Sequence, residues 1–282
     1  MKRVSGGYTI LEVMIFLVVS LTLLAAAIKL VSGKQSEVTF DQSVRDIQSK
    51  LNDWINDVST GFPGGDVNQL NCTAAPNSRP VINNTGPNVE PDCIFLGKAI
   101  QFTTKDASPT QDGLLYVYSV FGNRLHDGVL PANLSEASPA PAVGRAGTGN
   151  ADLTESFSLG SAYVKTVCAI PVGSNICTSS HLIGFFSTFN TENTTTENGS
   201  EDINAFQFRF NGGDFTPRGD ALVNCLELRG GCGLPLGLPP EQWPEKFGSF
   251  KICLSDDKHS AQITIQSVNG VGASTKLDYI TC

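Results

Sequence analysis

The feature that most constrains this chain is an apolar segment near its N-terminus, Tyr8–Val31. Within Val13–Ile28 the only polar side chains are those of Ser20 and Thr22. As a helix rising ~1.5 Å per residue, the segment would extend over roughly 36 Å, more than the ~30 Å hydrocarbon core of a bilayer. It therefore predicts a membrane-spanning helix, and no later apolar run is long enough to be a second one.

A short basic leader with a glycine pair precedes this segment. Lys2 and Arg3 are followed by Gly6 and Gly7. A secretory signal peptide is cleaved after its apolar stretch, whereas this processing-like glycine pair stands before it. We therefore expect the apolar segment to stay on the mature protein and the basic leader to lie on the cytoplasmic side. The alternatives are an ordinary signal anchor or a cleaved signal peptide.

Glu12 places a carboxylate near the start of the apolar segment. A charged side chain at the centre of a bilayer costs on the order of 2.5 kcal/mol or more. We therefore expect some partner that compensates this charge.

These residues resemble the N-terminus of the type IV prepilin and pseudopilin superfamily. Precursors of that family carry a short basic leader ending in Gly, then an apolar or aromatic first mature residue, then Glu at the fifth mature position. The resemblance implies cleavage between Gly7 and Tyr8 by a prepilin peptidase and N-methylation of Tyr8. The same resemblance implies that Glu12 pairs with the terminal amine of a neighbouring subunit, an ion pair that in a dry interface would relieve the burial of the carboxylate and fix subunit register. It also implies an α+β, pilin-like fold, in which a long N-terminal helix packs on an antiparallel β-rich globular head with disulfides.

Helical periodicity continues beyond the apolar segment. Apolar residues recur every three or four positions, at Phe40, Val44, Ile47, Leu51, Trp54, Ile55 and Val58. Gly61 and the following Phe62 and Pro63 supply a stop. We therefore expect one helix from Tyr8 to about Ser59, and a coiled coil is the less favoured alternative because the stripe lasts few heptads. The expected parts are a leader (1–7), the helix (8–60, with a membrane or filament part at 8–31 and an amphipathic part at 32–60) and an extracytoplasmic head (61–282).

The head is predicted to be antiparallel β-structure, because short β-rich runs alternate with Gly, Pro, Asn and Ser rather than with helical patterns. The strands expected are Ile94–Thr103, Leu114–Phe121, Ala162–Ile170, Leu182–Phe189, Ile203–Phe210, Ala221–Leu228, Ser249–Leu254, Gln262–Val268 and Lys276–Thr281. Two insertions, Arg124–Gly160 and Asn190–Asp202, are expected to be exposed loops.

Eight cysteines all lie in the expected head: Cys72, Cys93, Cys168, Cys177, Cys225, Cys232, Cys253 and Cys282. An even number outside the cytoplasm fits four disulfides, although the sequence does not fix their pairing. Our working expectation joins neighbours along the chain. The resemblance implies the last of these pairs, Cys253 with Cys282, which would close the C-terminal region. A metal site is the alternative, but no CxxC pair is present and His126, His181 and His259 are scattered.

The charge and the motifs argue against other classes of function. The formal charge of −8 becomes −10 when the two positive charges of Lys2 and Arg3 are removed with the leader, which disfavours non-specific binding to nucleic acid. The chain has no phosphate-binding loop, zinc-protease helix or nucleophile elbow. We therefore expect no enzyme activity, no catalytic residues, no cofactor and no metal; the acidic runs Glu192–Asp202 and Asp256–Asp257 are expected to be solvated turns rather than calcium sites.

The functional expectation is a structural subunit of a type IV pilus or pilus-like filament, either a minor pilin or a large major one. The chain would be a single-pass membrane protein before assembly, with its head outside, and would then reach the cell surface in the pilus. Its expected partners are other pilin subunits, the prepilin peptidase, the pilus assembly platform and the membrane. The alternatives are a pseudopilin of a type II secretion-like system and a pilus-borne adhesin that binds a host or partner-cell surface.

Overall fold

A computed structural model describes a long N-terminal helix and a series of strands that follow it. The described residues are 9–63, 71–73, 80–83, 88–89, 92–103, 113–125, 127–129, 131, 137–138, 140–141, 155–171, 173, 175–179, 182–187, 203–208, 245–268 and 272–282. The chain forms two compact units, Met1–Gln42 and Ser43–Cys282.

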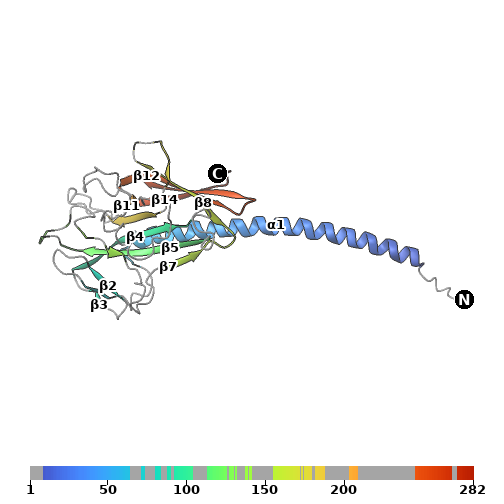
Figure 1. The fold of residues 1–282 in the computed structure, drawn as a ribbon, viewed down its shortest axis with the longest axis horizontal. Helices are drawn as coiled ribbons and strands as arrows, with labels where there is room; N and C mark the ends of the chain where they lie inside the picture. The colour runs from blue at the N-terminus through green and yellow to red at the C-terminus, as the bar shows by residue number, and fades with distance from the viewer. Residues whose placement is uncertain are drawn as a thin grey trace. The chain divides into compact units, whose positions relative to one another are not determined.

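Helix α1, Ile10–Ser59, is one continuous element (Figure 1). It ends where its sequence predicts. Phe62 N donates to Asp57 O at 2.8 Å and Gly61 N to Val58 O at 3.2 Å, the paired bonds of a Schellman cap. Gly61 has a φ of 69°, which a residue without a Cβ adopts at little cost.

The amphipathic stripe of α1 is buried as predicted. Each of its apolar members is at most 5% exposed: Phe40, Val44, Ile47, Leu51, Trp54, Ile55 and Val58. In the second unit this stripe packs on the strands, and the Trp54 ring meets Phe157 edge to face with centroids 6.1 Å apart. At the start of the same unit, Ser43 Oγ lies 3.2 Å from Ser161 Oγ.

The strands form one large sheet and one small sheet. In chain order they are β1 Asn71–Thr73, β2 Val81–Asn83, β3 Asn88–Val89, β4 Cys93–Phe102, β5 Leu114–Asn123, β6 Ala140–Pro141, β7 Glu155–Ser158, β8 Tyr163–Pro171, β9 Thr178–Ser179, β10 Leu182–Ser187, β11 Ile203–Phe208, β12 Glu245–Ser255, β13 Ser260–Val268 and β14 Gly272–Asp278. Among the described strands, the large sheet has the order β14-β13-β12-β11-β10-β4-β5-β6, and β7 also pairs with β5, β8 with β12, and β9 with β8.

Every described pairing in the large sheet is antiparallel, as expected. The small sheet has the order β2-β1-β3, and its β1–β3 pairing is parallel. The described chain therefore has one long N-terminal apolar helix, a large antiparallel sheet and a small mixed sheet, an α+β arrangement.

Two sequence expectations need correction. Arg124–Gly160 was expected to be an exposed loop, but its described part contains β6 and β7, which both pair with β5. Leu159 and Ala137 in the same insertion are buried, because their neighbours complete the sheet edge. The last strand is β14, Gly272–Asp278, rather than Lys276–Thr281. The expected strand Ala221–Leu228 and the loop Asn190–Asp202 lie outside the described residues.

Candidate assembly surface

The N-terminal part of α1 presents apolar side chains to its surroundings along its whole length. Between Ile10 and Ile28 the large apolar residues are 46% to 83% exposed. They are Ile10, Leu11, Val13, Met14, Ile15, Phe16, Leu17, Val18, Val19, Leu21, Leu23, Leu24 and Ile28. The helix is long and apolar enough to cross a membrane. A contiguous apolar surface of this extent marks a site that lipid or other protein covers.

Glu12 lies exposed in the first turn of this helix. Its backbone N–H donates to Thr9 Oγ1 at 3.3 Å, and Val13 N donates to Thr9 O at 3.2 Å. Thr9 is therefore the N-cap of α1, and Glu12 stands three residues later, the spacing of a capping box. A carboxylate in this turn interacts favourably with the positive end of the helix dipole. This role was not among the sequence predictions, although Thr9-Ile10-Leu11-Glu12 carries the capping pattern.

One hydroxyl within the apolar surface is bonded inside the helix, and charged side chains follow the surface at its end. Thr22 Oγ1 donates to Val19 O at 2.8 Å, so this hydroxyl is bonded within the helix itself. Beyond the apolar stretch, Lys34 Nζ lies 2.8 Å from Glu37 Oε2. The hydrogen bond to Glu37 and its negative charge raise the pKa of Lys34. The exposed surface of α1 therefore changes from apolar to charged at Lys34 and Glu37, before the buried stripe begins at Phe40.

The expected processing site lies outside the described residues. Gly6, Gly7 and Tyr8 are the residues at which cleavage and N-methylation are expected. These roles stay predictions. The described helix begins two residues after Tyr8, so the expected cut would leave Thr9 and Glu12 in the mature chain.

Three disulfides join described cysteines, and each joins neighbours along the chain. The pairs are Cys72–Cys93, Cys168–Cys177 and Cys253–Cys282, with Cα atoms 6.2, 5.5 and 6.1 Å apart. The first is buried beside Phe121. Cys225 and Cys232, the expected fourth pair, lie outside the described residues.

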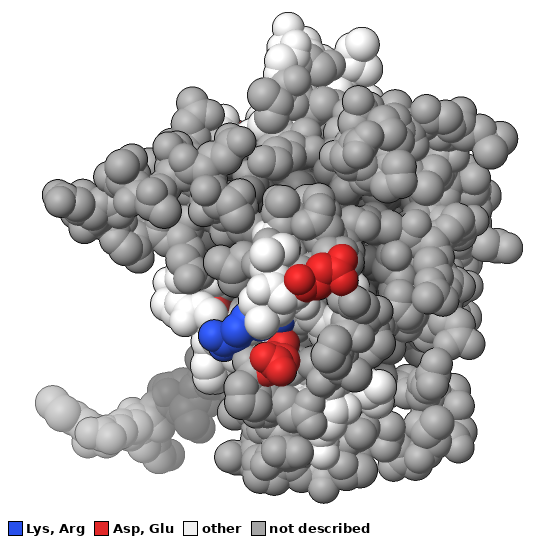
Figure 2. All heavy atoms as spheres, turned by 90° about the vertical axis from the view of Figure 1, so that its left-hand side faces the viewer, with Lys and Arg blue, Asp and Glu red and all other residues white. Residues whose placement is uncertain are grey.

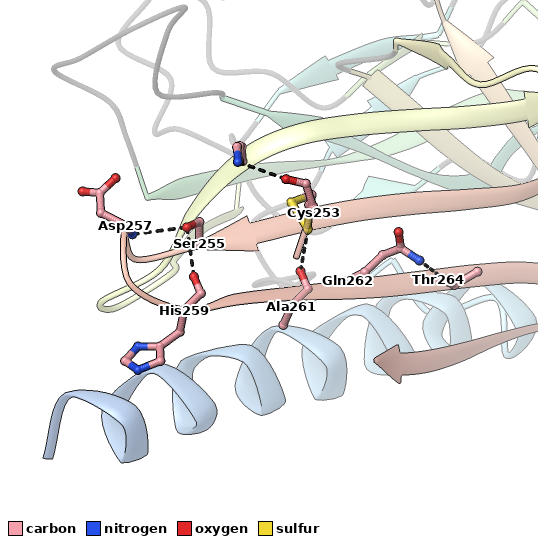
Figure 3. Close-up of a disulfide and its surroundings, with 9 residues drawn as sticks. Cys253, Ser255, Asp257, His259, Ala261, Gln262 and Thr264 are labelled. Carbon is pink, nitrogen blue, oxygen red and sulfur yellow. Dashed lines mark hydrogen bonds between the residues drawn. A yellow bond between two sulfur atoms is a disulfide. The ribbon is translucent and has the colours of Figure 1, made fainter. Parts of the chain in front are cut away.

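The acidic pair Asp256 and Asp257 forms the tight turn between β12 and β13 (Figure 3). Asp256 Oδ1 accepts from the backbone N–H of Lys258 at 2.9 Å and of His259 at 2.6 Å, while its Oδ2 lies 3.0 Å from His259 Nδ1. Burial acts to raise the pKa of Asp256, but the hydrogen bonds from His259 and Lys258 outweigh it and the pKa is lowered. Asp257 Oδ1 accepts from Tyr163 Oη at 2.5 Å. These oxygens are used within the protein to shape a turn.

Charged side chains of both signs lie close together on the face of the molecule drawn in Figure 2. The described part of that face shows basic groups beside acidic ones rather than a continuous basic patch. In the part of the chain that the structure describes, no group of three or more His, Cys, Asp or Glu side chains is arranged to hold a metal ion. Among the described residues, the strongest candidate for a functional surface is therefore the apolar part of α1.

Comparisons of the chain with protein-family models, with curated proteins and with solved structures found no match.

Proposed function

We propose that this chain is the precursor of a structural subunit of a type IV pilus or pilus-like filament. It would be held in the membrane by α1, cleaved between Gly7 and Tyr8, and assembled with other subunits through the apolar part of the helix. The large β-rich head would form the outside of the filament. Its size favours a minor pilin or a large major pilin.

The observation that carries the proposal is the apolar surface of α1, exposed on all sides from Ile10 to Ile28. A single membrane span needs such a surface, and so does a bundle of identical helices. A plain anchor needs no charge within it, however, and Glu12 is the one charged residue in this stretch. Because an unpaired carboxylate in hydrocarbon is costly, its presence favours a state in which another subunit supplies a positive group.

The disulfides support a head that lies outside the cytoplasm. Disulfides persist in oxidising compartments and are rare in the cytosol. Three of them join described cysteines. This agrees with the orientation that Lys2 and Arg3 predict, with the leader in the cytoplasm and the head beyond the membrane.

The test is to shear surface filaments from cells that express the full chain and to measure this protein in them by mass spectrometry, including its N-terminal peptide. We expect a peptide that begins at Tyr8. We also expect Glu12→Ala to insert in the membrane normally and to be depleted at least roughly tenfold from filaments, because each subunit would lose its ion pair. The matched control is Asp53→Ala, which removes an exposed carboxylate from the other half of the same helix and should assemble normally.

The outcomes separate the alternatives. Normal incorporation of Glu12→Ala would contradict the role of Glu12 in assembly. A processed chain that stays in membranes and is absent from sheared filaments would favour a secretion pseudopilin, and an uncleaved chain would favour an ordinary signal anchor. Loss of cell attachment with filaments intact, after changes in the head, would add an adhesive role.

A further inference from the structure

The chain after β14 forms a short strap, Tyr279–Cys282, that returns over the neighbouring strands to the C-terminal part of β12. Its Cys282 is bonded to Cys253 of β12, two strands away from β14 in the sheet. The sulfur of Cys282 also lies 3.6 Å from Ala261 O of β13, and Lys165 Nζ of β8 donates to Cys282 O at 3.1 Å. The strap therefore crosses β13; it is bonded to β12 through the disulfide at Cys253 (Figure 3) and to β8 through Lys165.

The strap crosses the polar face of these strands. Along β12, Phe250, Ile252 and Leu254 are fully buried, and alternating side chains point to opposite faces of a sheet. Cys253 therefore points away from that apolar face. On β13 the partners of the buried residues, Ile263 and Ile265 among them, are buried in the same way.

The strand that the strap secures, β14, lies at the edge of the sheet. Among the described strands it pairs with β13 alone. On its apolar side, Thr275 contacts α1 directly: it donates to Asn52 Oδ1 at 2.9 Å and accepts from Gln48 Nε2 at 3.2 Å. Because edge strands separate more easily than central ones, this contact depends on what holds β14 in place.

We propose that the Cys253–Cys282 disulfide is a latch that acts on helix α1 through β14. When the bond is closed, the strap keeps β14 on the sheet and Thr275 on Gln48 and Asn52. When it is opened, the edge strand frays and the helix loses this side-chain contact. This latch lies within the head, and it would act whether or not the chain assembles into filaments.

A dithiol reductant can open the latch by ordinary thiol–disulfide exchange. Cys282 is exposed, whereas Cys253 is 5% exposed, so a thiolate attacks Cys282 Sγ and Cys253 leaves as a thiolate that takes up a proton. The second thiol of the reductant then resolves the mixed disulfide. Two electrons and two protons pass to the protein, giving two cysteine thiols, and the dithiol becomes a disulfide.

The test is hydrogen exchange of the full-length chain in detergent, comparing the wild type with the double variant Cys253→Ser/Cys282→Ser. We expect amide protection to fall roughly tenfold or more in β14 and in the Gln48–Ile55 part of α1, and to stay unchanged in β4 and β5. The matched control is Cys168→Ser/Cys177→Ser, which removes another partly exposed disulfide of the same sheet and should leave β14 and α1 protected.

A second variant tests whether the effect reaches α1 through Thr275. Thr275→Val should loosen the Gln48–Ile55 part of α1 while β14 stays protected. Removing the latch in that background should then add little at the helix, because both changes interrupt the same coupling. Unchanged protection of α1 without the latch would overturn the proposal, and so would additive effects of the two changes. A uniform loss of protection in all strands would also overturn it, because the disulfide would then act on global stability.

Discussion

Lys98 is the most deeply buried basic residue among those described. Its side chain is 1% exposed, and it forms an ion pair with Asp57, whose side chain is 25% exposed. The two residues come from β4 and from the last turn of α1, so the pair fastens the end of the helix to the sheet. Asp57 can keep part of its hydration when alone, whereas the Lys98 ammonium cannot.

This asymmetry predicts unequal effects of removing the two partners. Asp57→Ala should destabilise the chain by about 3 kcal/mol, because it leaves a buried charge without its partner. Lys98→Met keeps much of the volume and should cost about 1.5 kcal/mol or less. Denaturant unfolding of the two variants measures the difference, with Asp53→Ala as the exposed control. Equal losses in the free energy of unfolding would contradict this asymmetry, because Asp57 and Lys98 would then depend equally on the ion pair.

Asp256 makes the turn between β12 and β13 sensitive to acid. Its folded pKa lies below the ordinary value of 3.8, so its stabilising effect is complete above that value and is lost as the pH falls through the folded pKa. Asp256→Ala should therefore cost about 1 kcal/mol at neutral pH and progressively less as the pH falls below the ordinary carboxyl pKa of 3.8.

Unfolding curves of the wild type and of Asp256→Ala at neutral and acid pH test this. His259→Ala is the informative companion, since it removes the side-chain bond but leaves the backbone donors of Lys258 and His259. It should therefore reproduce only part of the loss. A difference between Asp256→Ala and the wild type that stays constant with pH would contradict a role for the ionised carboxylate.

At the scale of elements, the sequence predicts the helices and strands that have one apolar face and one polar face. The stripe of α1 follows the helical period because one side meets the head core. Strand β12 alternates Phe250, Lys251, Ile252 and Cys253 because one face is apolar and the other polar. In each case the chemistry of neighbouring residues reports which side is buried.

The elements that the sequence did not predict lack that signal. Strand β7 is Glu-Ser-Phe-Ser, with three polar residues out of four, and Phe157 is its contact with Trp54. The two-residue strand β6 is Ala140 and Pro141. Both form because β5 offers an edge, and this information lies in tertiary structure rather than in the local sequence. The same holds for the strap, whose path over β13 no local pattern reveals.

Within the candidate assembly surface, the sequence located the apolar span and Glu12 directly, because composition and charge suffice to find them. The N-cap role of Thr9 could also be predicted, because its three-residue spacing to Glu12 is a local pattern. The contacts of Gln48 and Asn52 with Thr275 were not readable. They join residues more than 200 positions apart, and only the fold brings them together.

At the scale of the whole molecule, the chain combines a unit that exposes apolar surface with a unit that buries it. The buried stripe of α1 begins at Phe40, and Ser43 lies against Ser161 in the turn between β7 and β8. A helix whose exposed part serves membrane or filament contacts should therefore contribute little to the stability of the head.

Truncation tests this division. A chain that begins at Glu37 should be soluble and folded with its disulfides intact, and its Tm should lie within about 4 °C of the full-length protein in detergent, a shift of roughly 1 kcal/mol for a chain of this size. A chain that begins at Gly61 should fail to fold, because it lacks Trp54, Leu51 and the other core residues of α1. Circular dichroism and disulfide mapping of the two truncations supply the measurement. If the chain that begins at Glu37 were unfolded, the exposed part of α1 would be needed for folding of the head. Its apolar surface could then not serve membrane or filament contacts alone.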